Sequence, residues 1–102
     1  SGPVYKSIEI NDDKAIVDFD YAESGFVFFN GKINGFEIAG EDKVFHPASV
    51  SIMYGKNVSK LTITSDKVKK PVAVRYGWKN YVEGNLYSTK GLPASSFRSD
   101  NW

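Results

Sequence analysis

Cysteine is absent from this 102-residue chain, which excludes disulfides and thiolate metal sites. Histidine occurs once, at His46, so neither a metal site built only from histidines nor a catalytic pair of two histidines can form. No apolar run approaches the roughly 18 residues that a membrane-spanning helix needs. We therefore expect no metal, no cofactor and no insertion into a membrane.

An excess of charge of one sign is also missing. Thirteen lysines and arginines against twelve acidic residues leave a net charge of +1. Such a balance provides no strong field to attract a polyanion, and nucleic acid is not an expected partner. The hydrophobic content of 41% and the aromatic content of 15% indicate instead a chain with a packed core.

Apolar residues recur with period two along most of the chain, which is typical of strands with one buried face. Turn residues interrupt this pattern about every 8–12 positions, and no helical period lasts longer than a turn. We predict an all-β, antiparallel β-sandwich of about seven strands, immunoglobulin-like or jelly-roll, forming a single domain over residues 1–102. The expected strands are residues 4–10, 14–20, 25–29, 32–40, 44–54, 58–65 and 71–78, followed by an irregular aromatic C-terminal loop.

Two local signals refine this prediction. Asn30-Gly31 favours a type I′ turn, which predicts a hairpin between residues 25–29 and 32–40. Pro47 has no backbone N–H to donate, so it marks an edge or a bulge within residues 44–54.

The run of residues 26–29 is apolar on both strand faces, although a lone small sandwich covers only one face of each sheet. One face of this strand should therefore meet a loop, a partner or another domain. The C-terminal segment 91–102 is irregular yet apolar at several positions, which predicts a strap that packs on the sandwich or on a neighbouring domain. The candidates for interdomain packing are Phe28, Phe29, Leu92, Phe97 and Trp102.

No set of residues with the pattern of a catalytic centre was found. His46 could formally combine with a serine of the tail and Asp100, but no serine stands in a nucleophile elbow, and we interpret His46 as a strand-edge residue. A glycosidase needs two carboxylates that face each other across a cleft. Asp18 and Asp20 instead share one face of a strand, so we interpret them as exposed residues that favour solubility. We predict no catalytic residue.

Considered by residue chemistry alone, the aromatic residues near the C-terminus give the strongest indication of function. Aromatic faces beside amide groups suit sugars, because a pyranose ring has an apolar face and a hydroxylated rim. In the alternative interpretation, Trp78 belongs to the core by its spacing from Val74, and the later tyrosines only fasten the loop. The candidate substrate-binding residues are Trp78, Asn80, Tyr81, Asn85 and Tyr87.

Three runs of the sequence, GFEIAGEDKVFHPASV (35–50), SDKVKKPVAVRYGW (65–78) and GNLYSTKGLPASSFRSDNW (84–102), resemble the C-terminal segment of the sialate O-acetylesterase family. The opening SGPVYKSIEI resembles the stretch that follows the catalytic domain of that family. The chain also begins without methionine, and we expect it to be a piece of a longer protein.

The resemblance implies an accessory β-sandwich whose catalytic α/β domain, of the Ser-Gly-Asn-His hydrolase type, is missing from this chain. The implied partner is that domain of the same polypeptide, and an acetylated glycan is a further candidate. It implies a secreted or periplasmic location, no catalytic residue in this chain, and no activity of the chain alone. An autonomous carbohydrate-binding module remains the alternative.

Overall fold

The structure, a computed structural model, describes residues 1–29, 31–53, 55–79 and 84–102. These residues form strands, loops and one short 3-10 turn, η1 (Gly55–Asn57), and none of them lies in an α-helix. The part of the chain so described also holds no helix with the length and apolar character of a membrane span. The strands are β1 (Val4–Asn11), β2 (Lys14–Asp20), β3 (Phe26–Phe28), β4 (Phe36–Ala39), β5 (His46–Pro47), β6 (Ser49–Ile52), β7 (Lys60–Thr64), β8 (Ala73–Tyr76), β9 (Leu86–Ser88) and β10 (Phe97–Arg98).

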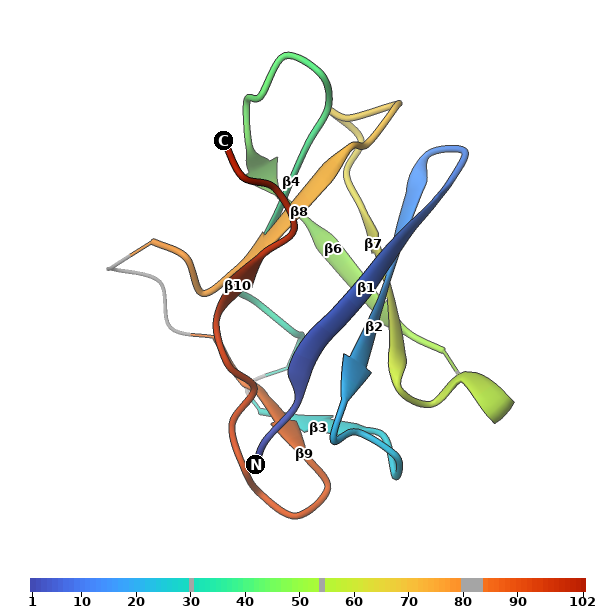
Figure 1. The fold of residues 1–102 in the computed structure, drawn as a ribbon, viewed down its shortest axis with the longest axis vertical. Coiled ribbons are helices and arrows are strands. Elements are labelled where there is room, and N and C mark those ends of the chain that lie inside the picture. The colour runs from blue at the N-terminus through green and yellow to red at the C-terminus, as the bar shows by residue number, and fades with distance from the viewer. Residues whose placement is uncertain (30, 54, 80–83) are drawn as a thin grey trace.

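The strands form two four-stranded antiparallel sheets and one smaller pair (Figure 1). The first sheet has the order β1-β2-β7-β6, and the second has the order β10-β8-β4-β5. Strands β3 and β9 pair with each other at the end of the sandwich near the N-terminus (Figure 1). The predicted β-sandwich is confirmed, with more and shorter strands than expected.

The core lies between the two large sheets, and the period-two pattern explains which residues fill it. From the first sheet, β2 buries Ala15, Val17 and Phe19, and β7 buries Leu61 and Ile63. The second sheet buries Phe36, Ile38, Val74 and Tyr76. The alternation predicted for these strands is therefore confirmed.

Phe97 in β10 also belongs to this core, since its side chain is only 7% exposed. Its ring stacks on Tyr5, with centroids 4.7 Å apart, and makes edge contacts with Phe19 and Phe36. The strap packs on the sandwich, which is one of the two expected alternatives, because it returns to the open edge of β8 and inserts the Phe97 ring between the sheets. The assignment of Phe97 to interdomain packing is therefore wrong. Phe28 is likewise half-buried against the core of its own domain.

Two predictions about strand pairing are also wrong. Strand β3 pairs with β9, almost sixty residues away, and not with the residues after Gly31, while β4 pairs with β8 and β5. The strand expected over residues 44–54 is instead two strands in different sheets within the described residues 44–53, since β5 lies in the second sheet and β6 in the first. The chain crosses between the sheets directly after Pro47, which lies on an edge strand as expected.

Candidate functional site

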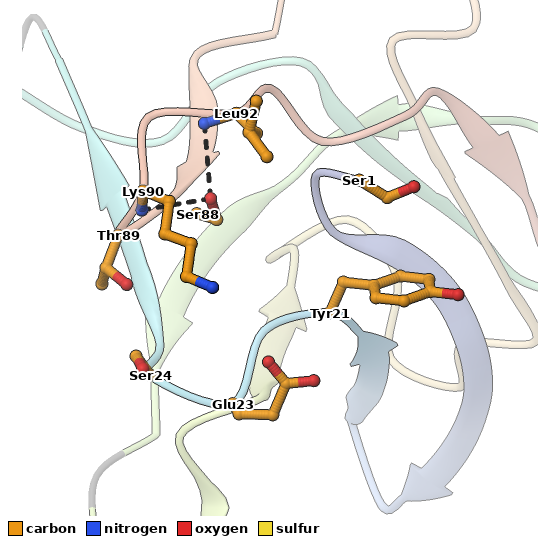
Figure 2. Close-up of a pocket in the computed structure, with 8 residues that line it drawn as sticks. All are labelled: Ser1, Tyr21, Glu23, Ser24, Ser88, Thr89, Lys90 and Leu92. Atoms are coloured by element: carbon orange, nitrogen blue, oxygen red, sulfur yellow. Dashed lines mark hydrogen bonds between the residues drawn. The ribbon is translucent and has the colours of Figure 1, made fainter.

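A pocket of about 160 Å³ opens between two loops and the N-terminus (Figure 2). One loop follows β2, and the other runs from the end of β9 into the strap. We call it the Tyr21 pocket. It is lined by Ser1, Tyr21, Glu23, Ser24, Ser88, Thr89, Lys90 and Leu92.

The loop after β9 is fixed by hydrogen bonds centred on Ser88. The Ser88 hydroxyl oxygen accepts the backbone N–H groups of Lys90 at 3.2 Å and Leu92 at 3.3 Å (Figure 2). The Ser88 N–H donates to the Leu92 carbonyl at 2.8 Å, and the Gly91 N–H donates to the Ser88 carbonyl at 2.9 Å. The side chain of Lys90 is thus carried on a turn whose backbone is held in place.

The loop after β2 turns one aromatic ring outward. Ala22 is buried, and its carbonyl accepts the Gly25 N–H at 3.0 Å, which closes the turn. Tyr21 has a φ of 63°, a left-handed conformation that costs a residue with a side chain about 1 kcal/mol or more. Its side chain remains 55% exposed. The fold therefore holds Tyr21 in an unfavourable backbone conformation while leaving its ring accessible.

The N-terminal residues complete the rim. The Ser95 N–H donates to the carbonyl of Pro3, which is fully buried, at 3.0 Å. A side chain at Gly2 would collide with the Pro93 carbonyl, so only glycine allows the two backbones to approach this closely. This contact places Ser1 beside Tyr21 at the pocket (Figure 2).

The side chains that line the pocket carry one charge of each sign. Figure 2 shows the Lys90 side chain extending from one wall and the Glu23 carboxylate rising from the floor into the same space. Neither side chain has a hydrogen bond or an ion pair with any residue that the structure describes. The two groups are therefore free to bind a ligand, and their charges cancel.

A second surface with aromatic and charged side chains is the outer face of the second sheet. Arg98, Arg75 and Glu37 lie opposite one another on adjacent strands of this face. The Arg98 guanidinium lies 5.0 Å from the Trp78 ring, and the Lys79 ammonium contacts the Glu37 carboxylate at 2.7 Å. Trp78 is 43% exposed, so it belongs to this surface and not to the core.

The end of the chain packs against the same face. The Trp102 ring contacts Phe45 edge-on, with centroids 5.8 Å apart, and the Arg75 guanidinium lies 4.0 Å from the Phe45 ring. Arg98 donates a hydrogen bond to the Trp102 carbonyl at 2.9 Å. Trp102 is thus fastened to its own domain while 37% of its surface stays exposed.

Asn85 has a structural role, and the expectation that it contacts substrate is wrong. Its side chain is 9% exposed, and its amide nitrogen donates to the carbonyls of Phe29 at 2.5 Å and Lys32 at 2.8 Å. Its amide oxygen accepts the Asn34 N–H at 2.9 Å. Because these contacts use the polar atoms to hold the loop before β4, Asn85 presents none of them at the surface.

Of the other predicted substrate residues, the two that the structure describes, Trp78 and Tyr87, make separate contacts. Tyr87 is half-buried in β9, where its ring contacts the exposed Phe29 with centroids 5.3 Å apart, whereas Trp78 follows β8 and contacts Arg98. Asn80 and Tyr81 lie outside the described residues. Of the predicted packing residues, Phe29, Leu92 and Trp102 are exposed, and Leu92 lines the Tyr21 pocket.

The surroundings of His46 show no catalytic triad among the described residues. His46 borders an open groove with Ser49 and Asp66. Asp100, the formal partner in a triad, is bound to Arg75 instead. Within the described ranges, no three histidine, aspartate or glutamate side chains are arranged to hold a metal ion.

Sequence reasoning missed the Tyr21 pocket. Its residues come from three separate segments, and none of these segments contains a recognisable motif. The one available signal was Tyr21 itself, a large aromatic side chain placed in a turn, where small polar residues are usual.

The chain is similar to part of a carbohydrate acetylesterase from Xanthomonas citri with a known crystal structure. The sequences are 40% identical, the TM-score is 0.88, and the similarity covers 98% of this chain. The chain is related to a carbohydrate esterase. It spans only 23% of the length of that chain. No protein-family model and no curated protein matches the sequence.

Proposed function

We propose that the chain is a non-catalytic accessory β-sandwich of a carbohydrate O-acetylesterase and packs on the catalytic domain of the same polypeptide. The observation that carries this proposal is the similarity to about a quarter of an acetylesterase at 40% identity. As parts of the same proposal, the domain is C-terminal, the enzyme is of the sialate O-acetylesterase type, and it acts in the periplasm or outside the cell.

The surface of the domain supports a role beside a larger neighbour. Phe29, Trp78, Leu92 and Trp102 each expose more than a third of their surface. Trp78 and Trp102 both contact Arg98 on the outer face of the second sheet, and exposed apolar side chains gathered on one face mark a surface that contacts another domain or a ligand. No buried side-chain polar atom of the described residues lacks a hydrogen-bond partner, so the domain leaves no such atom for a neighbour to satisfy.

An assay of the chain alone and within the whole enzyme tests this proposal. The isolated chain should not hydrolyse an aryl acetate, and the whole enzyme should lose activity or stability when the chain is deleted. Turnover by the isolated chain that disappears in His46→Ala, but persists in Ser49→Ala from the same groove, would refute the non-catalytic role.

An autonomous carbohydrate-binding module is the second candidate, favoured by the exposed Trp78 ring beside Arg98. Here, glycan binding by the isolated chain should be abolished by Trp78→Ala and unchanged by Phe29→Ala. Full activity of the enzyme on soluble glycans without the chain would also favour this candidate over the accessory role.

A further inference from the structure

We propose that the Tyr21 pocket is a subsite for one neutral sugar ring of a glycan. This inference rests on the proposed function only for the choice of a carbohydrate as ligand. The site itself follows from the side chains that the fold brings together.

The shape of the pocket limits the size of the ligand. Its volume of about 160 Å³ is roughly five times the ~30 Å³ that one water molecule occupies in the liquid. Pockets that enclose drug-sized ligands are larger, about 300 Å³ or more. The Tyr21 pocket therefore accommodates a single ring, and the rest of a glycan would continue into solvent through the open side.

The lining suits the two kinds of surface on a pyranose. Tyr21 and Leu92 both line the pocket and supply apolar surface that can cover the C–H face of a ring (Figure 2). The Glu23 carboxylate can accept hydrogen bonds from sugar hydroxyls, and the Lys90 ammonium can donate to a hydroxyl or carbonyl oxygen. The hydroxyls of Ser24 and Thr89 add groups that both donate and accept.

The side-chain charges of the pocket offer an anionic sugar no net attraction. Lys90 alone would attract a carboxylate, but Glu23 faces the same space and offsets that attraction (Figure 2). An acidic sugar in the pocket would bring a second carboxylate close to Glu23. We therefore assign the subsite to a neutral ring, even where the glycan carries an acidic sugar elsewhere.

Backbone hydrogen bonds organise the pocket before a ligand binds. The Ser88 hydroxyl fixes the turn that carries Lys90, and the buried Ala22 fixes the turn that carries Tyr21. Such preorganisation lowers the entropy lost on binding.

The test is an NMR titration of the isotope-labelled chain, with the α-amino group of Ser1 acetylated so that it adds no positive charge at the pocket. The probes are the methyl β-glycosides of glucose, galactose, mannose and xylose, together with methyl β-glucuronide, which differs from the glucoside by a carboxylate. We expect at least one neutral glycoside to shift the amide signals of residues 21–24 and 88–92, with a dissociation constant on the order of millimolar. The glucuronide should bind about tenfold more weakly than the glucoside.

Three variants and one control sharpen the result. Tyr21→Asn removes the ring but keeps a residue that tolerates the left-handed backbone, and it should weaken binding about threefold to tenfold. Lys90→Met should weaken binding by a similar factor, and Glu23→Gln should bring the glucuronide close to the affinity of the glucoside. Phe29→Ala, which removes an exposed aromatic ring outside the pocket, should leave binding unchanged.

The proposal is overturned if no neutral glycoside shifts these signals at about 50 mM, well above the expected dissociation constant. It is also overturned if the amide signals that shift belong to residues near Trp78 and if the same shifts occur in Tyr21→Asn and Lys90→Met. Neither result refutes the accessory role, because that role is tested by the aryl acetate assay and by deletion of the chain from the whole enzyme.

Discussion

Arg75 in β8 and Asp100 near the end of the chain form a bidentate ion pair. The guanidinium donates from Nε to Oδ1 at 3.1 Å and from Nη2 to Oδ2 at 2.8 Å. The Asp100 side chain is only 2% exposed, and its carboxylate also accepts the Trp102 N–H at 3.1 Å. This pair therefore joins the last residues of the strap to the centre of the second sheet.

Replacing Asp100 with asparagine should lower the free energy of unfolding by about 1–3 kcal/mol. The loss arises because the partly buried Arg75 guanidinium, 20% exposed, would keep its charge without an equivalent acceptor. Urea unfolding of both proteins at pH 7 measures this difference. Asp20→Asn, at an exposed position, is the control and should change stability by less than about 0.5 kcal/mol. Equal stability of the Asp100 variant and the native chain would show that the pair contributes nothing.

The contribution of Asp100 should also disappear in acid. The hydrogen bonds from Arg75 lower the pKa of Asp100 below its usual value, although burial partly opposes this shift. A pKa lowered in the folded state means that the stabilisation is present above the unfolded pKa of about 3.9 and is lost as pH falls through the lower, folded value. The stability difference between the native chain and Asp100→Asn should therefore shrink below about pH 4. Urea unfolding between about pH 6 and about pH 2 tests this, and a constant difference would contradict it.

Asn85 should prove essential for stability and dispensable for binding. Asn85→Ala leaves the Phe29 and Lys32 carbonyls and the Asn34 N–H without their partner, which should cost about 2–3 kcal/mol. Chemical unfolding measures the loss, with the exposed Asn101→Ala as control. An unchanged stability together with lost glycan binding would instead support contact with substrate.

Gly84 should not tolerate a side chain, because a Cβ there would collide with the ring and hydroxyl of Tyr76. Tyr76 cannot yield easily: it is 3% exposed, its ring packs on Phe36 with centroids 4.5 Å apart, and its oxygen accepts the Leu86 N–H at 3.1 Å. Gly84→Ala should therefore destabilise the fold by about 1–3 kcal/mol. In a Tyr76→Ala background the same change should cost little, so a double-mutant cycle measures the clash. If the two substitutions changed the free energy of unfolding additively, the predicted clash between a Gly84 side chain and Tyr76 would be contradicted.

The sandwich could be predicted from the sequence where strands alternate between buried and exposed residues. Strands β2, β4 and β7 show this pattern, because one face of each strand meets the core and the other meets solvent. Their buried residues could therefore be assigned from spacing alone. The same rule failed for the edge strand β1, where Ile10 has the spacing of an inward residue but is 44% exposed, although its partner Ala15 in β2 is fully buried.

Long-range pairing could not be predicted in the same way. Asn30-Gly31 is a strong local turn signal, but the partner of β3 is β9, which local propensity does not reveal. The crossing after Pro47 and the insertion of Phe97 into the core depend on how the sheets meet, and a period-two pattern contains no such information. The Tyr21 pocket was hidden for the same reason, since residues 1, 21–24 and 88–92 come together only in the folded chain.

Limited proteolysis distinguishes the two trypsin sites of the C-terminal segment. Lys90 lies in an exposed turn, so the bond after it should be cut first, through local opening of the turn. The backbone around Arg98 is held more firmly, because it pairs with β8. Next to it, the Ser99 N–H donates to the Val74 carbonyl at 2.9 Å, and the Ser99 hydroxyl accepts the Val74 N–H at 2.9 Å. Cleavage after Arg98 should therefore require more extensive unfolding and should accelerate in Asp100→Asn. Mass spectrometry of timed digests gives the order of the cuts, and Lys90→Gln removes the first one as a control. Early cleavage after Arg98 in the native chain would show that the strap is not held to the second sheet.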